Sequence, residues 1–187
     1  MKLAGLLFAV SCTGLAWVGG MAHAQQGLKF TGIDCSASKI VAPPGLVCLV
    51  SNERAGGDFG AGTSEGLFKY WTAISRKDVA RKTYYYAVEA LETKSTVRIG
   101  DKLVDEIQRV SAQAKGATDI SGLNQLAGAD YVTFKAGTGE FCVGFRRAGP
   151  SKLTGYAWVL YGTECAPHGQ RLGEGDVSKF ISASTFK

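Results

Sequence analysis

Few side chains in this sequence combine the types and the spacing that catalysis requires. Histidine, the most frequent acid–base catalyst and metal ligand near neutral pH, occurs only at His23 and His168. Cys165 and His168 have a spacing that could bind a metal ion, but no second pair of such ligands lies near them in the sequence. We therefore expect His168 to be a surface residue, and we expect neither a metal site nor a cofactor.

Hydrolytic chemistry has two candidate locations. Residues 62–66, Gly-Thr-Ser-Glu-Gly, have the Gly-x-Ser-x-Gly spacing of a catalytic serine, but the strand-to-helix context that this motif needs is missing around Ser64. Paired carboxylates are the other possibility, and Asp58 and Glu65 lie in the same glycine-rich segment, whereas Glu140 lies far along the chain. A small secreted hydrolase that uses Asp58 and Glu65 is the alternative functional hypothesis.

Aromatic residues favour a binding function over a catalytic one. Aromatic platforms beside basic groups can stack sugars or bind polymers. The aromatic side chains gather in two parts of the sequence: Phe68, Tyr70, Trp71, Tyr84, Tyr85, Tyr86, Tyr156, Trp158 and Tyr161. Alternation along a strand sends about half of such residues to the core. For an outward binding face, we predict Tyr85 and Tyr161 together with Arg146 and Arg147.

Residues 1–24 have the features of a cleaved secretory signal. A basic residue precedes the apolar run from Leu3 to Val18, and Ala22-His23-Ala24 forms a small-x-small cleavage motif. The run is shorter than the about 20 apolar residues of a transmembrane anchor. Cys12 is a poor match to the acylated cysteine of a lipoprotein, which is the other alternative. We expect one exported domain over residues 25–187.

Export would place the remaining cysteines in an oxidising compartment, where two disulfides are expected. The four candidates are Cys35, Cys48, Cys142 and Cys165. Four cysteines allow three pairings. We predict Cys35–Cys48 and Cys142–Cys165, because each closes a short loop, and a loop of about 15 residues contributes roughly 3 kcal/mol to stability.

The charge balance is mildly basic, with 21 Lys and Arg against 16 Asp and Glu. The most compact basic cluster is Arg76-Lys77 with Arg81-Lys82. Such a balance fits ordinary solubility, and it also fits weak attraction to anionic surfaces such as envelope polymers. No recognition helix or long basic stripe is apparent, so nucleic acid is not an expected partner. We expect no stable membrane insertion once the leader is removed.

Hydrophobic periodicity indicates which segments are strands and which are helices. Strands are predicted over residues 28–33, 46–50, 67–75, 83–91, 131–135, 140–147 and 155–162. Helices are predicted over residues 101–115, 120–127 and 174–184, and the glycine-rich residues 54–66 read as a loop. The pattern predicts an α+β fold: a mostly antiparallel sheet with a C-terminal three-stranded meander, packed by two or three helices, with helices 101–115 and 174–184 on one face.

The functional prediction from these observations is a non-enzymatic binding or interaction protein of the cell envelope, periplasmic or secreted and stabilised by two disulfides. Its expected partner is an anionic envelope polymer or another envelope protein.

Overall fold

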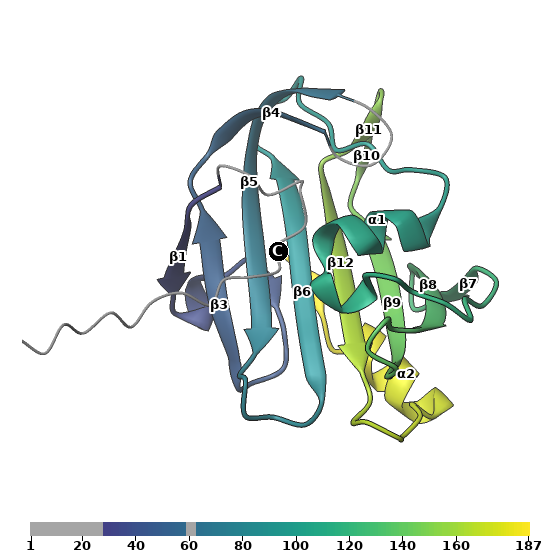
Figure 1. Ribbon diagram of the computed structural model, residues 1–187. Coiled ribbons are helices and arrows are strands. Elements are labelled where there is room, and N and C mark those ends of the chain that lie inside the picture. The colour runs from purple at the N-terminus through teal and green to yellow at the C-terminus, as the bar shows by residue number, and fades with distance from the viewer. Residues whose placement is uncertain (1–27, 59–62) are drawn as a thin grey trace, which may run out of the picture.

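Every strand pair of the main sheet is antiparallel. The computed structural model describes residues 28–58 and 63–187, without the side chains of residues 56–65 (Figure 1). In spatial order the strands are β1 (Phe30–Ile33), β3 (Leu46–Ser51), β5 (Thr63–Ser75), β6 (Lys82–Ala90), β12 (Trp158–Cys165), β9 (Phe141–Ala148), β8 (Ala129–Lys135) and β7 (Asn124–Leu126). The predicted leader at residues 1–24 lies outside the described residues.

Short elements complete the fold. Strand β4 (Arg54–Asp58) pairs with the first half of β5, and two small ribbons lie apart from the main sheet. The ribbons are β10 (Ser151–Lys152) with β11 (Gly155–Tyr156), and β2 (Ile40–Val41) with β13 (Thr185–Phe186). The helices are α1 (Leu103–Val110), α2 (Glu174–Ser182) and the single 3-10 turns η2 (Cys35–Ala37) and η3 (Ala112–Ala114).

The fold class is therefore β-rich, and the expected α+β class is wrong. Strands hold 45% of the described residues and helices hold 15%. The three-stranded C-terminal meander is present as β8, β9 and β12. Two segments account for much of the difference, since a predicted loop and a predicted helix both form strands.

The glycine-rich segment is the first of these. We expected a loop over residues 54–66, but β4 and the start of β5 pair there as a hairpin, with an irregularity in the register between Ala55 and Gly57. Glycine weakens a strand because it has no side chain to pack. Here the backbone of residues 54–58 forms its hydrogen bonds with β5. Local strand propensity does not reveal this pairing.

The second is the predicted helix over residues 120–127. Strand β7 and β8 form a hairpin instead, closed by Ala127 and Gly128, whose φ angles of 49° and 73° suit a two-residue turn of type I′. Ile120 and Leu123, two apolar residues of the predicted helix, are exposed. Gly128, which directly follows the predicted helix, is thus a turn residue.

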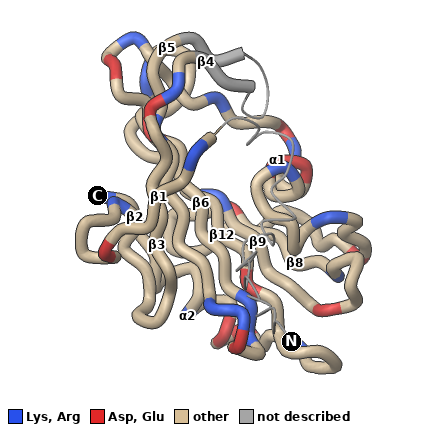
Figure 2. Tube along the Cα trace, turned by 60° about the vertical axis from the view of Figure 1, so that its left-hand side comes forward, with Lys and Arg blue, Asp and Glu red and all other residues tan. Residues whose placement is uncertain are grey.

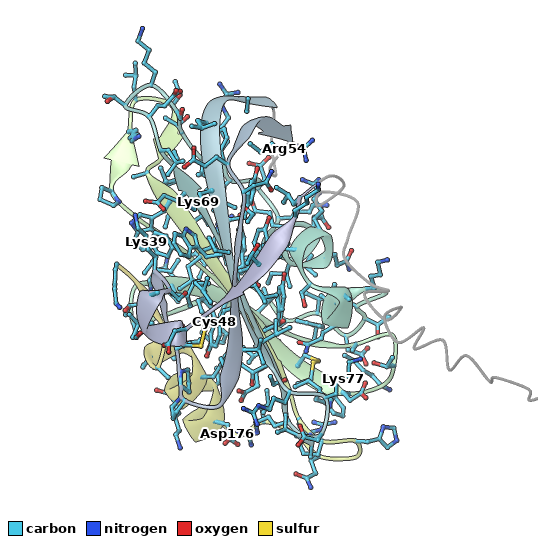
Figure 3. The ribbon with its side chains drawn as sticks, turned by 90° about the vertical axis from the view of Figure 1, so that its left-hand side faces the viewer. Lys39, Cys48, Arg54, Lys69, Lys77 and Asp176 are labelled. Carbon is cyan, nitrogen blue, oxygen red and sulfur yellow. A yellow bond between two sulfur atoms is a disulfide. The ribbon has the colours of Figure 1, made fainter. Side chains whose placement is uncertain are left out.

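Side chains alternate across the sheet and build two separate cores. The α1 face contains Phe68, Tyr70, Tyr86, Val88, Val132, Phe134, Cys142, Val159, Tyr161 and Cys165, under Leu103, Ile107 and Val110 of α1. The α2 face contains Cys48, Trp71, Ala73, Tyr85, Ala87, Val143, Phe145 and Leu160, under Val177, Phe180 and Ile181 of α2. Figure 3 shows the sheet nearly edge-on, with one helix on each side. The expectation that both helices cover one face is wrong.

A glycine on each face lets a bulky neighbour approach the sheet. A Cβ at Gly144 of β9 would meet the side chain of Ile107 from α1. A Cβ at Gly162 of β12 would meet the ring of Phe145 on the α2 face. The side chains of Ile107 and Phe145 occupy the space that a Cβ would fill at Gly144 and Gly162. The packing of each face therefore depends on glycine at that position.

The predicted disulfide pairing is confirmed. Cys35 bonds Cys48 with a Cα–Cα distance of 5.2 Å, and Cys142 bonds Cys165 with a Cα–Cα distance of 4.0 Å. Each face of the sheet contains one of the two bonds, because Cys48 lies in the α2-face core and the pair Cys142–Cys165 in the α1-face core. Two disulfides are consistent with an exported protein. Over the described residues, no helix has the length and apolarity to cross a bilayer.

Candidate functional site

The four residues predicted to form one binding face lie on opposite sides of the sheet. Tyr85 belongs to the α2-face core, and Tyr161 to the α1-face core. Arg146 and Arg147 are neighbours on β9, so their side chains also point to opposite faces. The opposite orientations of Arg146 and Arg147 could have been predicted from the sequence, because adjacent residues of a strand point to opposite faces.

Both tyrosines are core residues rather than stacking platforms. Their relative exposures are 0% for Tyr85 and 1% for Tyr161. The ring of Tyr85 lies 5.3 Å from that of Phe180 in α2, centroid to centroid. Burial raises the pKa of both phenols, so each remains a neutral hydroxyl at physiological pH. A ligand has no access to either ring.

Arg146 forms the centre of a buried charge cluster on the α1 face. Its Nη1 donates to Glu106 Oε2 at 2.8 Å, and its Nη2 donates to Asp130 Oδ2 at 2.9 Å. The same Nη1 donates to the carbonyl of Gly100 at 3.0 Å, and Glu106 Oε1 accepts from the Gly100 amide. Arg146 is 7% exposed and Glu106 is 3% exposed.

This cluster joins three segments that are distant in sequence. Glu106 comes from α1, Arg146 from β9 and Asp130 from β8. Burial alone would lower the pKa of Arg146, but its hydrogen bond to Asp130 and the charge of Glu106 raise that pKa above the usual value. A polar cavity of about 350 Å³ adjoins Asp130 and Arg146. The bonds of the guanidinium go to protein groups, so the cluster acts as a clamp between α1 and the sheet.

Arg147 fastens α2 on the other face. Its Nη1 donates to the carbonyl of Ser184 at 2.5 Å, and its Nη2 donates to the carbonyls of Ile181 and Ala127, each at 3.2 Å. Carbonyls at the end of a helix lack intrahelical partners and carry partial negative charge. Burial lowers the pKa of Arg147. Arg147 therefore supplies hydrogen-bond donors to the carbonyls at the C-terminal end of α2. These contacts give Arg147 a structural role.

The remaining catalytic candidates are spread over the chain. The side chains of Asp58, Ser64 and Glu65 lie outside the described residues, so a carboxylate hydrolase stays a prediction. The backbone of residues 63–66 continues as β5, which differs from the strand-to-helix turn of a serine elbow. His168 is exposed, as expected. For Glu140, a hydrogen bond from the side chain of Thr138 lowers the pKa of the carboxyl group. No cluster of three or more potential metal-ligating His, Cys, Asp or Glu residues occurs within residues 28–58 and 63–187.

A more accessible candidate lies at the turn between β5 and β6. Of the basic residues that are close in sequence, Arg76, Lys77 and Arg81 fall on this turn, and Lys82 is the first residue of β6. An open cavity of about 380 Å³ lies between the turn and the C-terminal end of α1. It is lined by Ile74, Ser75, Arg76, Lys77, Lys82, Thr83, Tyr84, Val110, Ser111, Ala112 and Gln113. We name this cavity the hairpin pocket.

Four cations at the turn have different environments. Arg81 Nη1 pairs with Glu164 at 3.3 Å and with Asp176 at 3.1 Å. Lys82 Nζ donates to the carbonyls of Lys77 and Val79, at 2.9 and 2.7 Å. Arg76 and Lys77 are exposed, and neither forms an ion pair with a described residue. Arg76 and Lys77 are thus the cations available to a ligand.

Sequence reasoning missed the partners of Arg146 and the second wall of the hairpin pocket. Within the helix predicted over residues 101–115, Glu106 falls in the apolar stripe of Leu103, Ile107 and Val110. A carboxylate at such a position signals a buried ion pair. Nothing in the sequence indicates that Gln113 approaches Lys77, because their proximity depends on how α1 packs on the sheet.

Comparison of the chain with models of protein families, with curated proteins and with solved structures finds no significant match.

Proposed function

We propose that the protein is an exported, non-enzymatic binding protein of the cell envelope that recognises an anionic polymer through the β5–β6 turn. The two disulfides support an extracytoplasmic location. The sequence-based prediction of a leader at residues 1–24 supports the same location. Arg146 and Arg147, which were first expected to bind the ligand, have structural partners, so the binding residues in this proposal are Arg76 and Lys77.

One observation carries the proposal: Arg76 and Lys77 form no ion pair within the described part of the chain, while the neighbouring exposed Arg81 pairs with two carboxylates. Arg81 already pairs with Glu164 and Asp176, so its charge is less available to a ligand than those of Arg76 and Lys77. Figure 2 shows basic segments at the end of the sheet near α2, beside acidic ones. Figure 3 places Lys77 on the side of the sheet that α1 covers, opposite Cys48.

A surface of this kind binds with modest strength and with strong salt dependence. Exposed charge pairs contribute about 0.2–1 kcal/mol each, and salt screens them over a distance of about 8–10 Å. A polymer offers many anionic groups to one pair of cations, so repeated weak contacts can raise the overall avidity. Binding should therefore weaken steeply as the ionic strength rises.

The test compares two charge-matched double variants of the oxidised protein. Arg76→Gln/Lys77→Gln removes the two turn cations, and Lys94→Gln/Arg98→Gln removes two exposed cations of residues 91–100, beyond the other end of β6. The measured quantity is the affinity for dextran sulfate, a polyanion probe, and for anionic polysaccharide purified from cell envelopes. We expect the turn variant to lose about tenfold in affinity at low salt, and the control variant to change little.

Equal losses in the two variants would overturn the proposal, because they would show that only net charge matters. Wild-type binding that is absent, or that persists unchanged in the turn variant, would overturn it as well. Circular dichroism of both variants confirms that the fold is retained.

A further inference from the structure

The hairpin pocket has one apolar side and one cationic side. Ile74, Tyr84 and Val110 are among its lining residues, and Arg76 and Lys77 line it where the turn begins. Val110 is buried in the α1-face core, and Tyr84 packs against the same core. A ligand that entered the pocket would meet apolar surface that continues into the protein interior, and it would meet positive charge beside that surface.

The two walls of the pocket come from segments far apart in sequence. One wall is the end of β5 and the start of β6, and the other is the C-terminal end of α1 with η3. Ser111 Oγ and Thr163 Oγ1 are 2.8 Å apart, and Thr163 Oγ1 donates to Gln113 Oε1 at 2.9 Å. These contacts hold η3 against β12, beside the Cys142–Cys165 disulfide. The wall is therefore formed before any ligand binds.

Lys82 contributes to the shape of the cationic side. Its ammonium group bonds the carbonyls of Lys77 and Val79, which folds the turn back toward β6. Two hydrogen bonds from one ammonium group thus hold the backbone of the turn without a carboxylate. As a result, Lys77 and Arg76 line the pocket while their charges stay unneutralised by described residues.

We propose that the hairpin pocket binds one small amphipathic anion, with its apolar body against Tyr84 and Val110 and its anionic group between Arg76 and Lys77. This inference rests on the proposed function, and it specifies the ligand as an anion with an apolar group. The volume of about 380 Å³ lies near the lower end of the range of small-molecule pockets. Charge complementarity favours an anion, and the apolar lining distinguishes this ligand from a free inorganic anion.

A variant that fills the pocket without changing its charge separates the two proposals. Ala112 lines the pocket and is exposed, so Ala112→Trp places a ring in the cavity with little effect on the core. The probe is anilinonaphthalene sulfonate, an aromatic anion whose fluorescence rises in apolar surroundings. Decanoate, an acyl anion, serves as the competitor, and inorganic phosphate serves as the anion without an apolar group.

We expect one saturable site for the probe on the wild-type protein. Ala112→Trp and Arg76→Gln/Lys77→Gln should each weaken probe binding at least about tenfold, with the Lys94→Gln/Arg98→Gln control unchanged. Decanoate should displace the probe if the natural apolar group is an acyl chain, and failure to displace it would assign an aromatic group. Phosphate should not displace it.

Unchanged probe binding in Ala112→Trp, or displacement by phosphate as effective as by decanoate, would overturn the pocket proposal. Dextran sulfate binding distinguishes this failure from that of the proposed function, since Ala112→Trp keeps both cations. If dextran sulfate depends on the turn cations while the probe ignores Ala112→Trp, only the pocket proposal fails. If the probe responds to both variants while no polyanion binds, only the polymer proposal fails.

Discussion

The two faces of the sheet are packed by different chemistry. On the α1 face, the apolar stripe of the helix is supplemented by the buried charges of Glu106 and Arg146 and by the partly buried Asp130. On the α2 face, the helix packs through ring contacts: the ring centroids of Tyr85, Phe145 and Phe180 lie 5.3 to 6.3 Å apart. The cations of the ion pairs on this face are more exposed than Arg146: Lys39 pairs with Glu89, and Arg81 pairs with Glu164 and Asp176.

The two kinds of packing fix the positions of the two helices on the sheet in different ways. Aromatic packing is strong but tolerates small shifts, whereas a buried ion pair is satisfied only in one arrangement. Helix α1 is 8 residues long, and the clamp to β8 and β9 adds directional bonds that fix its position. The same position defines one wall of the hairpin pocket, so the clamp supports the candidate site from a distance.

The largest expected effect is at the charge cluster. Arg146→Ala would leave Glu106 buried without its cationic partner, and loss of one partner of a buried ion pair typically costs about 3–5 kcal/mol. Urea unfolding monitored by circular dichroism measures the loss. Glu106→Gln is the matched control, because Arg146 would keep Asp130, and we expect a smaller loss there. A change below about 1 kcal/mol in Arg146→Ala would contradict the clamp.

The corresponding change on the α2 face is Phe180→Ala. Truncation of a buried aromatic residue typically costs about 3 kcal/mol or more. Because α2 lies close to the C-terminus of the chain, its packing can adjust, so we expect a loss near the lower end of that range. Phe180→Leu should lose only about 1 kcal/mol, because it keeps most of the buried volume. Unfolding experiments in low and high salt sharpen the comparison, since an apolar contact should respond to salt less than the charge cluster does. A loss in Phe180→Ala no greater than in Phe180→Leu would show that the buried volume of residue 180 does not stabilise this face.

Glycine substitutions should give intermediate effects on both faces. Overpacking of a core typically costs about 1–3 kcal/mol. Gly144→Ala meets the end of a flexible Ile107 side chain, whereas Gly162→Ala meets the rigid Phe145 ring. We therefore expect Gly162→Ala to lower the free energy of unfolding more than Gly144→Ala, as measured by urea denaturation. The reverse order would show that the aromatic layer adapts more readily than the helix contact.

The smallest effect concerns Glu164 at the edge of the α2 face. Burial raises its pKa above the usual 4.5, while Thr83 and Arg81 act in the opposite direction. Between pH 4.5 and the raised value, the folded state holds this proton more tightly than the unfolded state does, so this carboxyl destabilises the fold as pH rises.

Glu164→Gln removes that titration. Its stability relative to the wild type should increase from pH 4 to pH 7, by less than about 1 kcal/mol, because Arg81 loses a partner at the same time. Thermal unfolding at both pH values measures the difference. A relative stability that falls with pH would mean that the ion pair with Arg81 outweighs the cost of burial.

Local sequence patterns predicted a large part of this structure. The strands of the C-terminal meander follow from alternation, as in Val143 and Phe145, which both lie in the α2-face core. Helix α2 follows from the spacing of Val177, Phe180 and Ile181, which are all buried. Both disulfides follow from loop length. These features depend on residues near one another in sequence.

Predictions failed where distant segments compete with local patterns. The glycine-rich residues 54–58 have low strand propensity, yet pairing with β5 makes them a strand. Residues 124–126 resemble part of a helix, yet β8 pairs with them through a two-residue turn. The proposed binding face failed for a different reason, because alternation places Arg146 and Arg147 on opposite faces.

Local patterns in the sequence account for the alternating strands, the apolar stripes of two helices, the pairing of four cysteines and the basic cluster between residues 76 and 82. The packing of distant segments places α1 and α2 on opposite faces, pairs Arg146 with Glu106 and Asp130, and leaves Arg76 and Lys77 without ion pairs among the described residues. Local patterns suffice for the first group because periodicity and loop closure act over short stretches of chain. Burial and charge pairing, in contrast, depend on which distant segments the antiparallel ladder brings together.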